Sequence, residues 1–437
     1  MANEWIETVL KEVMDIKHGF AFPGENIRDV PPGDILLTPG NFAIGGGFKG
    51  DKYKYFDGVV PDEYVLNEGD LIVTMTDLSK QSDTLGYPAF VPESLGPRFL
   101  HNQRLGKVLI KEGAEIDKDF LFYLLRSSEY RNEVLASATG TTVKHTSPGR
   151  ILAFKADIPK LPEQEAIGSV LGRLDDKIEL NRNMNRTLEA MARALFKSWF
   201  VDFDPVRAKA DGRDTGLSAH IAAFFPDSFE DSGIGEIPLG WSIGKFGDVA
   251  ENPRRGVSPG EIPPQTPYIA LEHMPRKSIA LSEWGTADNV ESGKFSFRAN
   301  EILFGKLRPY FHKVGVAPVD GVCSTDILVV TPRSPEWFGF VLGHASSSAF
   351  VEHTNAGSTG TKMPRTNWND LARYPVVLPP TPIAKAFAAM TRTAVFRIVA
   401  STHENRTLAA LRDALLLKLI SGEIRINTAK LLNCEVN

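Results

Sequence analysis

The clearest pattern along the chain is a stretch in which mostly apolar side chains alternate at spacings of four and three. It begins after Pro162, and its members are Ile167, Leu171, Leu174, Ile178, Asn181, Asn185, Leu188, Ala192, Leu195 and Trp199. This spacing is typical of coiled-coil a and d positions, and proline suits a first helical turn because its missing N–H would have no partner there. We therefore predict a helix over residues 162–200. At about 1.5 Å per residue it would be roughly 57 Å long, too long to lie buried inside one small domain.

A second copy of this pattern follows 220 residues later. The tetrapeptide Asn-Arg-Thr-Leu occurs at 185–188 and again at 405–408, and the same shift pairs Pro162 with Pro382. The repeated seam is weaker than the first, and its members are Phe387, Thr391, Ala394, Ile398, Ser401, Asn405, Leu408, Arg412, Leu415 and Leu419. Self-similarity at a fixed offset is the mark of a duplicated unit. We predict a second long helix over residues 382–421.

Each predicted helix follows a region of short β-branched runs broken by glycine and proline, such as residues 34–38, 70–74 and 326–331. These runs indicate strands of compact domains. The predicted fold class is α/β (α+β), with two homologous globular domains separated by two long antiparallel helices and related by an internal pseudo-twofold axis. The expected division of the chain is a first domain at 1–161, a helix at 162–200, an acidic linker at 201–240, a second domain at 241–381, a helix at 382–421 and a basic tail at 422–437.

The two seams also predict a register for the helix pair. In the register that matches large with large side chains, Asn181 lies opposite Asn405 and Asn185 lies opposite Ser401. A buried polar layer of this kind costs stability but fixes register and orientation. The alternative is that the asparagines face water. The same register places Leu174 opposite Arg412, whose charged end should turn outward, toward Asp175.

Composition limits the class of protein. The chain has 437 residues, 42% of them hydrophobic and 24% charged, which suggests two or three soluble domains. Its two cysteines give neither a disulfide framework nor a zinc site, and the histidines show no metal spacing. No signal peptide or 18-residue apolar run is present, so a cytoplasmic location without membrane contact is expected. The net charge of −5 argues against coating nucleic acid through bulk positive charge.

Enzyme motifs are also missing from the sequence. The glycine-rich segments 40–47 and 356–362 lack the residues or the spacing of a phosphate-binding loop. Asp175-Asp176-Lys177 could imitate a nuclease metal site, but it adjoins the coiled-coil seam and is expected to be a solvated helix face. We also find no segment of the kind that an adenine methyltransferase uses to hold its base and methyl donor. The chain is therefore expected to be non-catalytic and to need no cofactor.

Several segments resemble one family. The runs at 162–167, 195–205, 235–241 and 302–310, in this order and with the duplication, are similar to those of type I restriction-modification specificity subunits. The second copy departs from the pattern at 382–385. The resemblance implies a subunit with two target-recognition domains, each contacting one part of a split sequence in double-stranded DNA, and with helices as spacer. Two methyltransferase (modification) subunits and restriction/translocase subunits would be its partners. The alternatives are a stand-alone nuclease or methyltransferase and a purely structural scaffold.

Candidate DNA contacts are side chains able to bond base edges or phosphates. In the first domain they are Gln103, Arg104, Thr142, Lys144 and His145. In the second domain they are Lys306, Arg308, Thr361, Lys362 and Arg365. We expect Lys306 and Arg308 to point to one face of a strand, because they lie two residues apart. The alternative for each group is a solvated loop or edge strand with no role in DNA binding. The polar loop at 76–81 is expected to be a surface of this kind.

Overall fold

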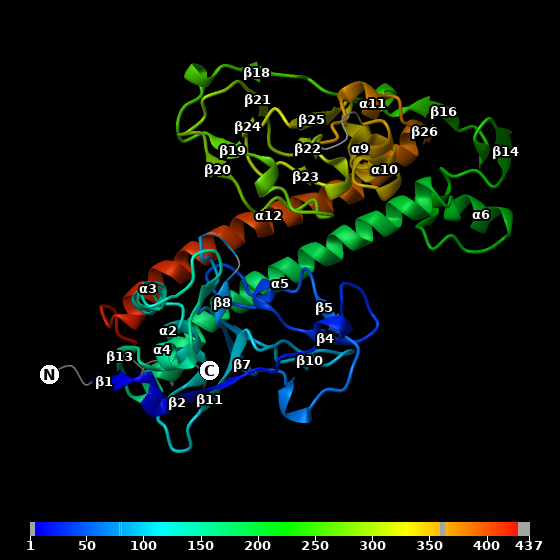
Figure 1. Ribbon diagram of the computed structural model, residues 1–437. Coiled ribbons are helices and arrows are strands. Elements are labelled where there is room, and N and C mark those ends of the chain that lie inside the picture. The colour runs from blue at the N-terminus through cyan, green and yellow to red at the C-terminus, as the bar shows by residue number, and fades with distance from the viewer. Residues whose placement is uncertain (1–4, 78, 80, 359–362, 427–437) are drawn as a thin grey trace, which may run out of the picture. The chain divides into compact units, whose positions relative to one another are not determined.

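The computed structural model describes residues 5–77, 79, 81–358 and 363–426. The chain forms two compact units. Unit 1 contains the residues up to Asp176 together with those from Ala409 onward, and unit 2 contains Lys177–Leu408. The chain has two long helices, α5 (Leu161–Phe200) and α12 (Thr381–Ile420) (Figure 1). Each of them is divided between the two units. The two long helices predicted from the seams are therefore present, and the fold is a mixed α/β architecture with two globular regions.

The globular part of unit 1 is built on two sheets. A four-stranded antiparallel sheet runs in the order β2-β11-β7-β9, and a five-stranded sheet runs in the order β3-β5-β4-β10-β6. The bounds are β2 (Met14–His18), β11 (Leu105–Ile110), β7 (Leu71–Thr74), β9 (Pro88–Phe90), β3 (Ile27–Arg28), β5 (Lys54–Phe56), β4 (Asp34–Leu36), β10 (Phe99–Leu100) and β6 (Val65–Leu66). Helices α2 (Lys118–Leu124), α3 (Ser128–Ala136) and α4 (Pro148–Leu152) pack on the four-stranded sheet, and the pair β1 (Ile6–Val9) and β13 (Lys155–Ile158) precedes α5.

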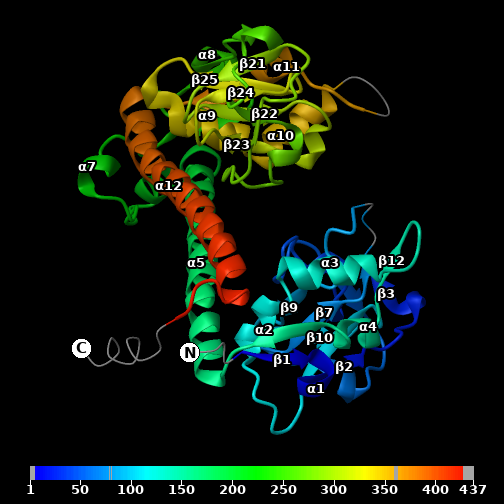
Figure 2. The same ribbon diagram turned by 90° about the vertical axis from the view of Figure 1, so that its left-hand side faces the viewer.

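Unit 2 repeats this plan. Its four-stranded antiparallel sheet, β17-β25-β22-β23, consists of β17 (Ala250–Glu251), β25 (Ile327–Pro332), β22 (Ile302–Gly305) and β23 (Val314–Val316). Helices α9 (Phe338–Ala345), α10 (Ser348–Ala356) and α11 (Trp368–Ala372) take the places of α2, α3 and α4 (Figure 2). The pair β16 (Ser242–Lys245) and β26 (Pro375–Leu378) likewise precedes α12. The duplication is therefore one of topology as well as of sequence.

The five-stranded sheets of the two units differ at one edge. Unit 2 has the order β18-β21-β24-β19-β20, with β18 (Gly256–Val257), β21 (Lys294–Phe297), β24 (Gly321–Cys323), β19 (Pro267–Ile269) and β20 (Gly285–Thr286). In both units the two central strands are parallel, β4 with β10 and β19 with β24. The strand that comes first along the chain, however, differs in its place. In unit 1, β3 joins β5, which neighbours β4, the earlier strand of the central pair. In unit 2, β18 joins β21, which neighbours β24, the later strand of the pair. The copies have diverged in the sheet while keeping their framework.

The acidic segment at 201–240 is folded and contributes to the core of unit 2. It contains α6 (Asp204–Ala210), α7 (Ala219–Ala222) and a hairpin of β14 (Phe229–Ser232) and β15 (Gly235–Pro238). Phe203 and Phe225 are buried in the same cluster as Trp241. This segment therefore packs against the second globular region in addition to leading the chain toward it.

Inside unit 2 the two long helices are antiparallel and meet at the asparagine layer. Asn181 is fully buried, and its Nδ2 donates to Asn405 Oδ1 at 2.9 Å and to Glu404 Oε2 at 2.9 Å. Further along the pair, the rings of Trp199 and Phe387 lie 5.7 Å apart. These contacts are those of the register that places Asn181 opposite Asn405.

The neighbouring polar pair differs from the expectation. Ser401 donates its hydroxyl to the carbonyl of Arg397 at 2.8 Å, and Asn185 Oδ1 is buried without a hydrogen-bond partner among the described residues. A serine hydroxyl in a helix can reach the carbonyl one turn earlier, and that local bond competes with a bond across the helix pair. Asn181 is therefore the member of the polar layer that bonds across the helix pair.

We expect Asn181→Ala to lower the free energy of unfolding by about 1–3 kcal/mol, because two acceptors lose their donor. Denaturant unfolding measures the loss. Asn183→Ala is the matched control, since Asn183 is exposed on the same helix. A double-mutant cycle with Asn405→Ala should give a coupling energy of about 0.5–1.5 kcal/mol. A coupling energy of zero would mean that this contact does not hold the register.

Candidate nucleic-acid interface

The candidate residues of the first domain meet at the end of strand β7. Met75 follows that strand; its N–H donates to the carbonyl of Arg104 at 2.9 Å, and its carbonyl accepts from the N–H of Thr146 at 3.0 Å. The turn at 103–104 and the strand β12 (Lys144–His145) therefore flank the same point. Gln103, Arg104 and His145 are exposed there, and Lys144 is half-buried.

Strand β12 is held in place by a short pairing. It runs antiparallel to β8 (Thr76–Asp77), and His145 Nδ1 lies 3.1 Å from Thr76 Oγ1. The structure thus brings together four of the five residues predicted for this domain. Thr142 is also exposed, two residues before β12.

The second domain builds the same junction from other side chains. The N–H of Lys306 donates to the carbonyl of Asp326 at 2.9 Å, and the carbonyl of Lys306 accepts from the N–H of Thr366 at 3.0 Å. Lys306 therefore occupies the place of Met75, and Asp326 the place of Arg104. A bridge between Leu307 and Arg365 stands where β8 pairs with β12. The two domains share one backbone arrangement at this point but present different side chains.

The expected strand alternation of Lys306 and Arg308 is wrong. Strand β22 ends at Gly305, and Arg308 has φ 52°, in the left-handed region. Pro309 begins a 3-10 turn, so the chain is not extended at these residues, and a two-residue spacing no longer puts side chains on one face. The N–H of Arg308 donates to the carbonyl of Pro364 at 2.7 Å, which ties this turn to the segment that carries Arg365. Thr361 and Lys362 lie outside the described residues.

Arg365 is exposed but already has a partner. Its Nη2 lies 3.5 Å from Asp326 Oδ1, and 55% of its side chain is accessible. An exposed pair at this distance is weak and readily exchanged for another anion. Arg365 therefore remains available to DNA, and Asp326 places a carboxylate where the first domain has Arg104.

Sequence reasoning missed Asp77, which shapes the loop beyond β8. Its buried carboxylate accepts hydrogen bonds from the N–H of Ser79 at 2.6 Å and the N–H and hydroxyl of Thr84 at 2.5 and 2.8 Å. Burial alone would raise the pKa of Asp77, but these bonds outweigh it and lower the pKa. An aspartate two residues before a serine is a local turn signal that could have been recognised. Asp77 therefore holds Ser79 and Thr84 in place beside the end of β8.

His101 lies near the candidate turn but is unsuited to binding phosphate. Its side chain is fully buried, and Nε2 lies 3.0 Å from the carbonyl oxygen of Leu105. Burial lowers the pKa of His101 to about 4, so the ring is neutral at physiological pH. The neighbouring cation available to DNA is therefore Arg104.

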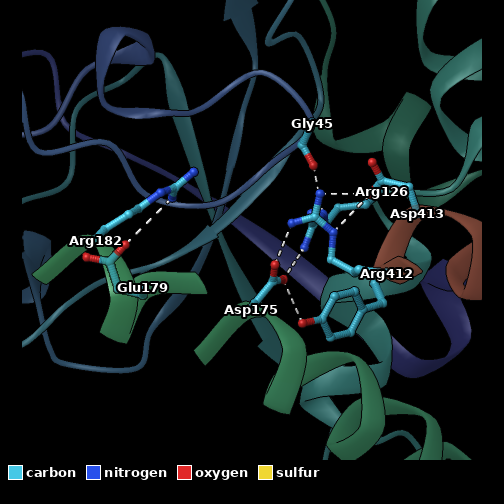
Figure 3. Close-up of polar contacts among 8 residues, drawn as sticks. Gly45, Arg126, Asp175, Glu179, Arg182, Arg412 and Asp413 are labelled. Atoms are coloured by element: carbon cyan, nitrogen blue, oxygen red, sulfur yellow. Dashed lines mark hydrogen bonds and ion pairs between the residues drawn. The ribbon is translucent and has the colours of Figure 1, made fainter. Parts of the chain in front are cut away.

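Asp175 on α5 contradicts the expectation of a solvated helix face (Figure 3). Its carboxylate binds Arg126 Nη1 at 2.8 Å, Arg412 Nη1 at 2.5 Å and the hydroxyl of Tyr123 at 2.8 Å. Arg126 also donates from Nε to the carbonyl of Gly45 at 2.7 Å. Within unit 1, this one carboxylate thus joins α5 to α12, to the end of α2 and, through Arg126, to a glycine-rich loop. Arg412 does turn toward Asp175, but its side chain is largely buried and does not turn outward as expected.

The charges of this cluster are strongly coupled. Only 5% of the Arg126 side chain and 17% of the Arg412 side chain are exposed. Burial would raise the pKa of Asp175, but the two guanidinium groups outweigh it and lower the pKa. Asp175 is therefore ionised at physiological pH and holds two largely buried cations that would otherwise repel each other.

Comparison with known proteins finds similarity to one family. The profile described as "Type I restriction modification DNA specificity domain" matches residues 3–190. The chain is 26% identical over 365 residues to the type I restriction enzyme HindI specificity subunit of Haemophilus influenzae, covering 70% of this chain and 77% of that protein. It is 24% identical over 448 residues to the MjaIX specificity subunit of Methanocaldococcus jannaschii, covering 97% and 94%. Over nearly its whole length, the chain is therefore similar to type I restriction enzyme specificity subunits.

A solved specificity subunit has the same fold. The crystal structure of the S subunit of a type I restriction-modification system from M. genitalium aligns with a TM-score of 0.56 at 13% identity, over 95% of this chain and 96% of that one. In the part of the chain that the structure describes, no helix is both long and apolar enough to cross a membrane.

Proposed function

We propose that this chain is the subunit that recognises the DNA sequence of a type I restriction-modification system, binding a bipartite target with one half-site per domain. The observation that carries the proposal is the repeated junction at the ends of β7 and β22. The same three backbone segments meet there in both domains, through the same pair of hydrogen bonds. A framework kept in two copies suits two similar tasks, namely holding two sets of side chains against two stretches of DNA.

The differences between the two junctions favour two different half-sites. The first presents Arg104 and His145, whereas the second presents Asp326 and Arg365 at the equivalent places. Each base pair shows its own pattern of donors and acceptors in the major groove, so exchanging a cation for a carboxylate changes which bases fit. We infer that the domains at 1–161 and 241–381 read unrelated sequences.

We infer further that this chain is non-catalytic and works in the cytoplasm with partner subunits. The family implies two methyltransferase subunits for each specificity subunit, with restriction/translocase subunits joining for cleavage. The net charge of −5 supports the inference that DNA binding depends on partner subunits, because a surface without excess positive charge supplies few phosphate contacts. In this view the long helices α5 and α12 act as the spacer between the two half-sites.

We expect the chain alone to bind its target at least tenfold more weakly than the complex with modification subunits, because the partners add phosphate contacts. Titration of a labelled target duplex at one fixed salt concentration measures both affinities. The complex should also show the steeper dependence of affinity on salt. Full specific affinity of the isolated chain, with no co-purifying methyltransferase, would contradict the proposal.

The direct test of the division of labour is an activity assay with purified components. The chain alone, supplied with magnesium or S-adenosylmethionine and plasmid, should neither cleave nor methylate DNA. Addition of the modification subunits should produce methylation at one bipartite sequence. Methyl transfer or cleavage by the chain alone would identify a stand-alone enzyme instead.

A further inference from the structure

The turn that follows β22 in unit 2 carries cations that lack anionic partners. Arg308 and Arg276 both lie over the ring of Phe311, with the carbon at the centre of each guanidinium 5.9 Å and 4.1 Å from the ring centroid. Neither guanidinium has an ion pair or a hydrogen bond among the residues that the structure describes. Both guanidinium groups therefore lie beside one aromatic ring with their charge available to an anion.

Backbone geometry fixes the position of this turn. Arg308 and His312, on either side of the 3-10 turn Pro309–Phe311, both have left-handed φ values, 52° and 50°. Left-handed backbone outside glycine is costly and persists only where surrounding contacts hold it. Here the N–H of Arg308 donates to the carbonyl of Pro364, and His312 Nε2 lies 2.8 Å from the carbonyl oxygen of Ser346. The turn is therefore held in shape before any ligand binds.

The local field is positive. Burial and then the positive charge of Arg276 lower the pKa of Lys313, although Glu272 acts in the opposite direction. Arg276 is exposed, and about half of the neighbouring Tyr310 side chain is accessible. Arg308 Nε, in contrast, is buried, and no described residue gives it a hydrogen bond. Arg308 can therefore offer an anion only its terminal amino groups.

We propose that Arg276 and Arg308, aligned on Phe311, form a site for a DNA backbone phosphate beside the half-site that the second domain reads. This proposal rests on the proposed function and deepens it. A phosphate can accept hydrogen bonds from two guanidinium groups at once, and its charge complements theirs. Among its described residues the first domain has no equivalent pair, since Asp77 follows Thr76 where Arg308 follows Leu307. Arg308 is thereby assigned to positioning on the DNA backbone rather than to base reading.

The test uses the full chain in complex with its modification subunits. Arg276→Gln and Arg308→Gln should each weaken binding by the same several-fold factor on the target and on a scrambled duplex. Each should also reduce the slope of log affinity against log salt by about 1. Arg333→Gln is the matched control, because Arg333 follows the far end of β25 and already pairs with Glu251 at 3.7 Å. The control should keep the slope of the unmodified complex.

Duplexes that each carry one uncharged methylphosphonate locate the phosphate. We expect one position next to the second half-site at which neutralisation weakens the unmodified complex but not Arg276→Gln. No such position, a loss confined to the target sequence, or an unchanged salt slope would overturn the site. If the unmodified complex fails to distinguish target from scrambled DNA, the proposed function itself fails. If it distinguishes them while Arg276→Gln behaves like Arg333→Gln, only this site fails.

Discussion

Replacing Asp175 with asparagine should lower the free energy of unfolding of unit 1 by about 3 kcal/mol, the largest stability effect that we expect from one substitution. The change removes the carboxylate that pairs with the largely buried Arg126 and leaves Arg412 with Asp413 alone, and removing one partner of a buried ion pair is strongly destabilising. For a unit of this size the loss corresponds to a fall of roughly 6–12 °C in the unfolding midpoint. Thermal unfolding followed by calorimetry measures it.

The neighbouring carboxylate provides the control. Asp176 is exposed, so Asp176→Asn should change the stability by no more than about 0.5 kcal/mol. Hydrogen exchange followed by mass spectrometry should show the loss of protection in α2 and in the part of α5 that belongs to unit 1. Equal stabilities of the two variants would mean that the Asp175 cluster does not hold unit 1 together.

Acid should reproduce the same loss. The folded-state pKa of Asp175 is lowered, so its ion pairs stabilise unit 1 at pH values above the ordinary carboxyl pKa of 3.8. This contribution disappears as the pH falls below 3.8 and the carboxylate takes up a proton. The stability difference between the unmodified protein and Asp175→Asn should therefore be full at pH 7 and shrink as the pH falls below 3.8.

The second large effect concerns sequence recognition. Lys144→Gln should weaken binding to the intact target by roughly 10- to 100-fold, the range expected for a lost base contact of about 1–3 kcal/mol. On a duplex whose first half-site is scrambled, the variant and the unmodified complex should bind alike. Lys306→Gln should show the mirror image, losing affinity only where the second half-site is intact. Each lysine lies at the junction of its own domain.

Competition titrations with the four duplexes that combine intact and scrambled half-sites separate these effects. Lys155→Gln is a suitable control, since Lys155 is an exposed lysine of the first domain that pairs with Glu7 on β1. Equal weakening on all four duplexes would assign Lys144 or Lys306 to phosphate contact. No weakening on any of them would remove the residue from the interface.

Local and periodic patterns explain what could be predicted from the sequence. Both long helices follow from the spacing of their apolar residues, and the opposition of Asn181 and Asn405 follows from matching two such seams. Side-chain contacts between distant segments could not be predicted in this way. Asp175 lies next to the seam in sequence, yet its surroundings are set by Arg126 and Arg412, which are 49 and 237 residues away.

In the candidate site, too, residue types could be recognised from the sequence, but contacts between distant segments could not. Residue type was enough to select Gln103, Arg104, Lys144 and His145, and the structure gathers them around one residue, Met75. The sequence could not show that Met75 and Lys306 are equivalent, because an apolar and a basic residue have no similarity to align. Their equivalence is carried by backbone hydrogen bonds, which residue type does not reveal. The same holds for Arg308, whose left-handed backbone ends the alternation that its spacing suggested.

The most direct test of the central claim is methylome sequencing of the host with and without this gene. Deletion should abolish methylation at one bipartite motif and leave all other modified motifs unchanged. Restoring the gene with Lys306→Gln should either lower methylation at that motif or extend methylation to sites that differ from it only in the second half. An unchanged methylome after deletion would contradict the proposal that this chain chooses the DNA sequence.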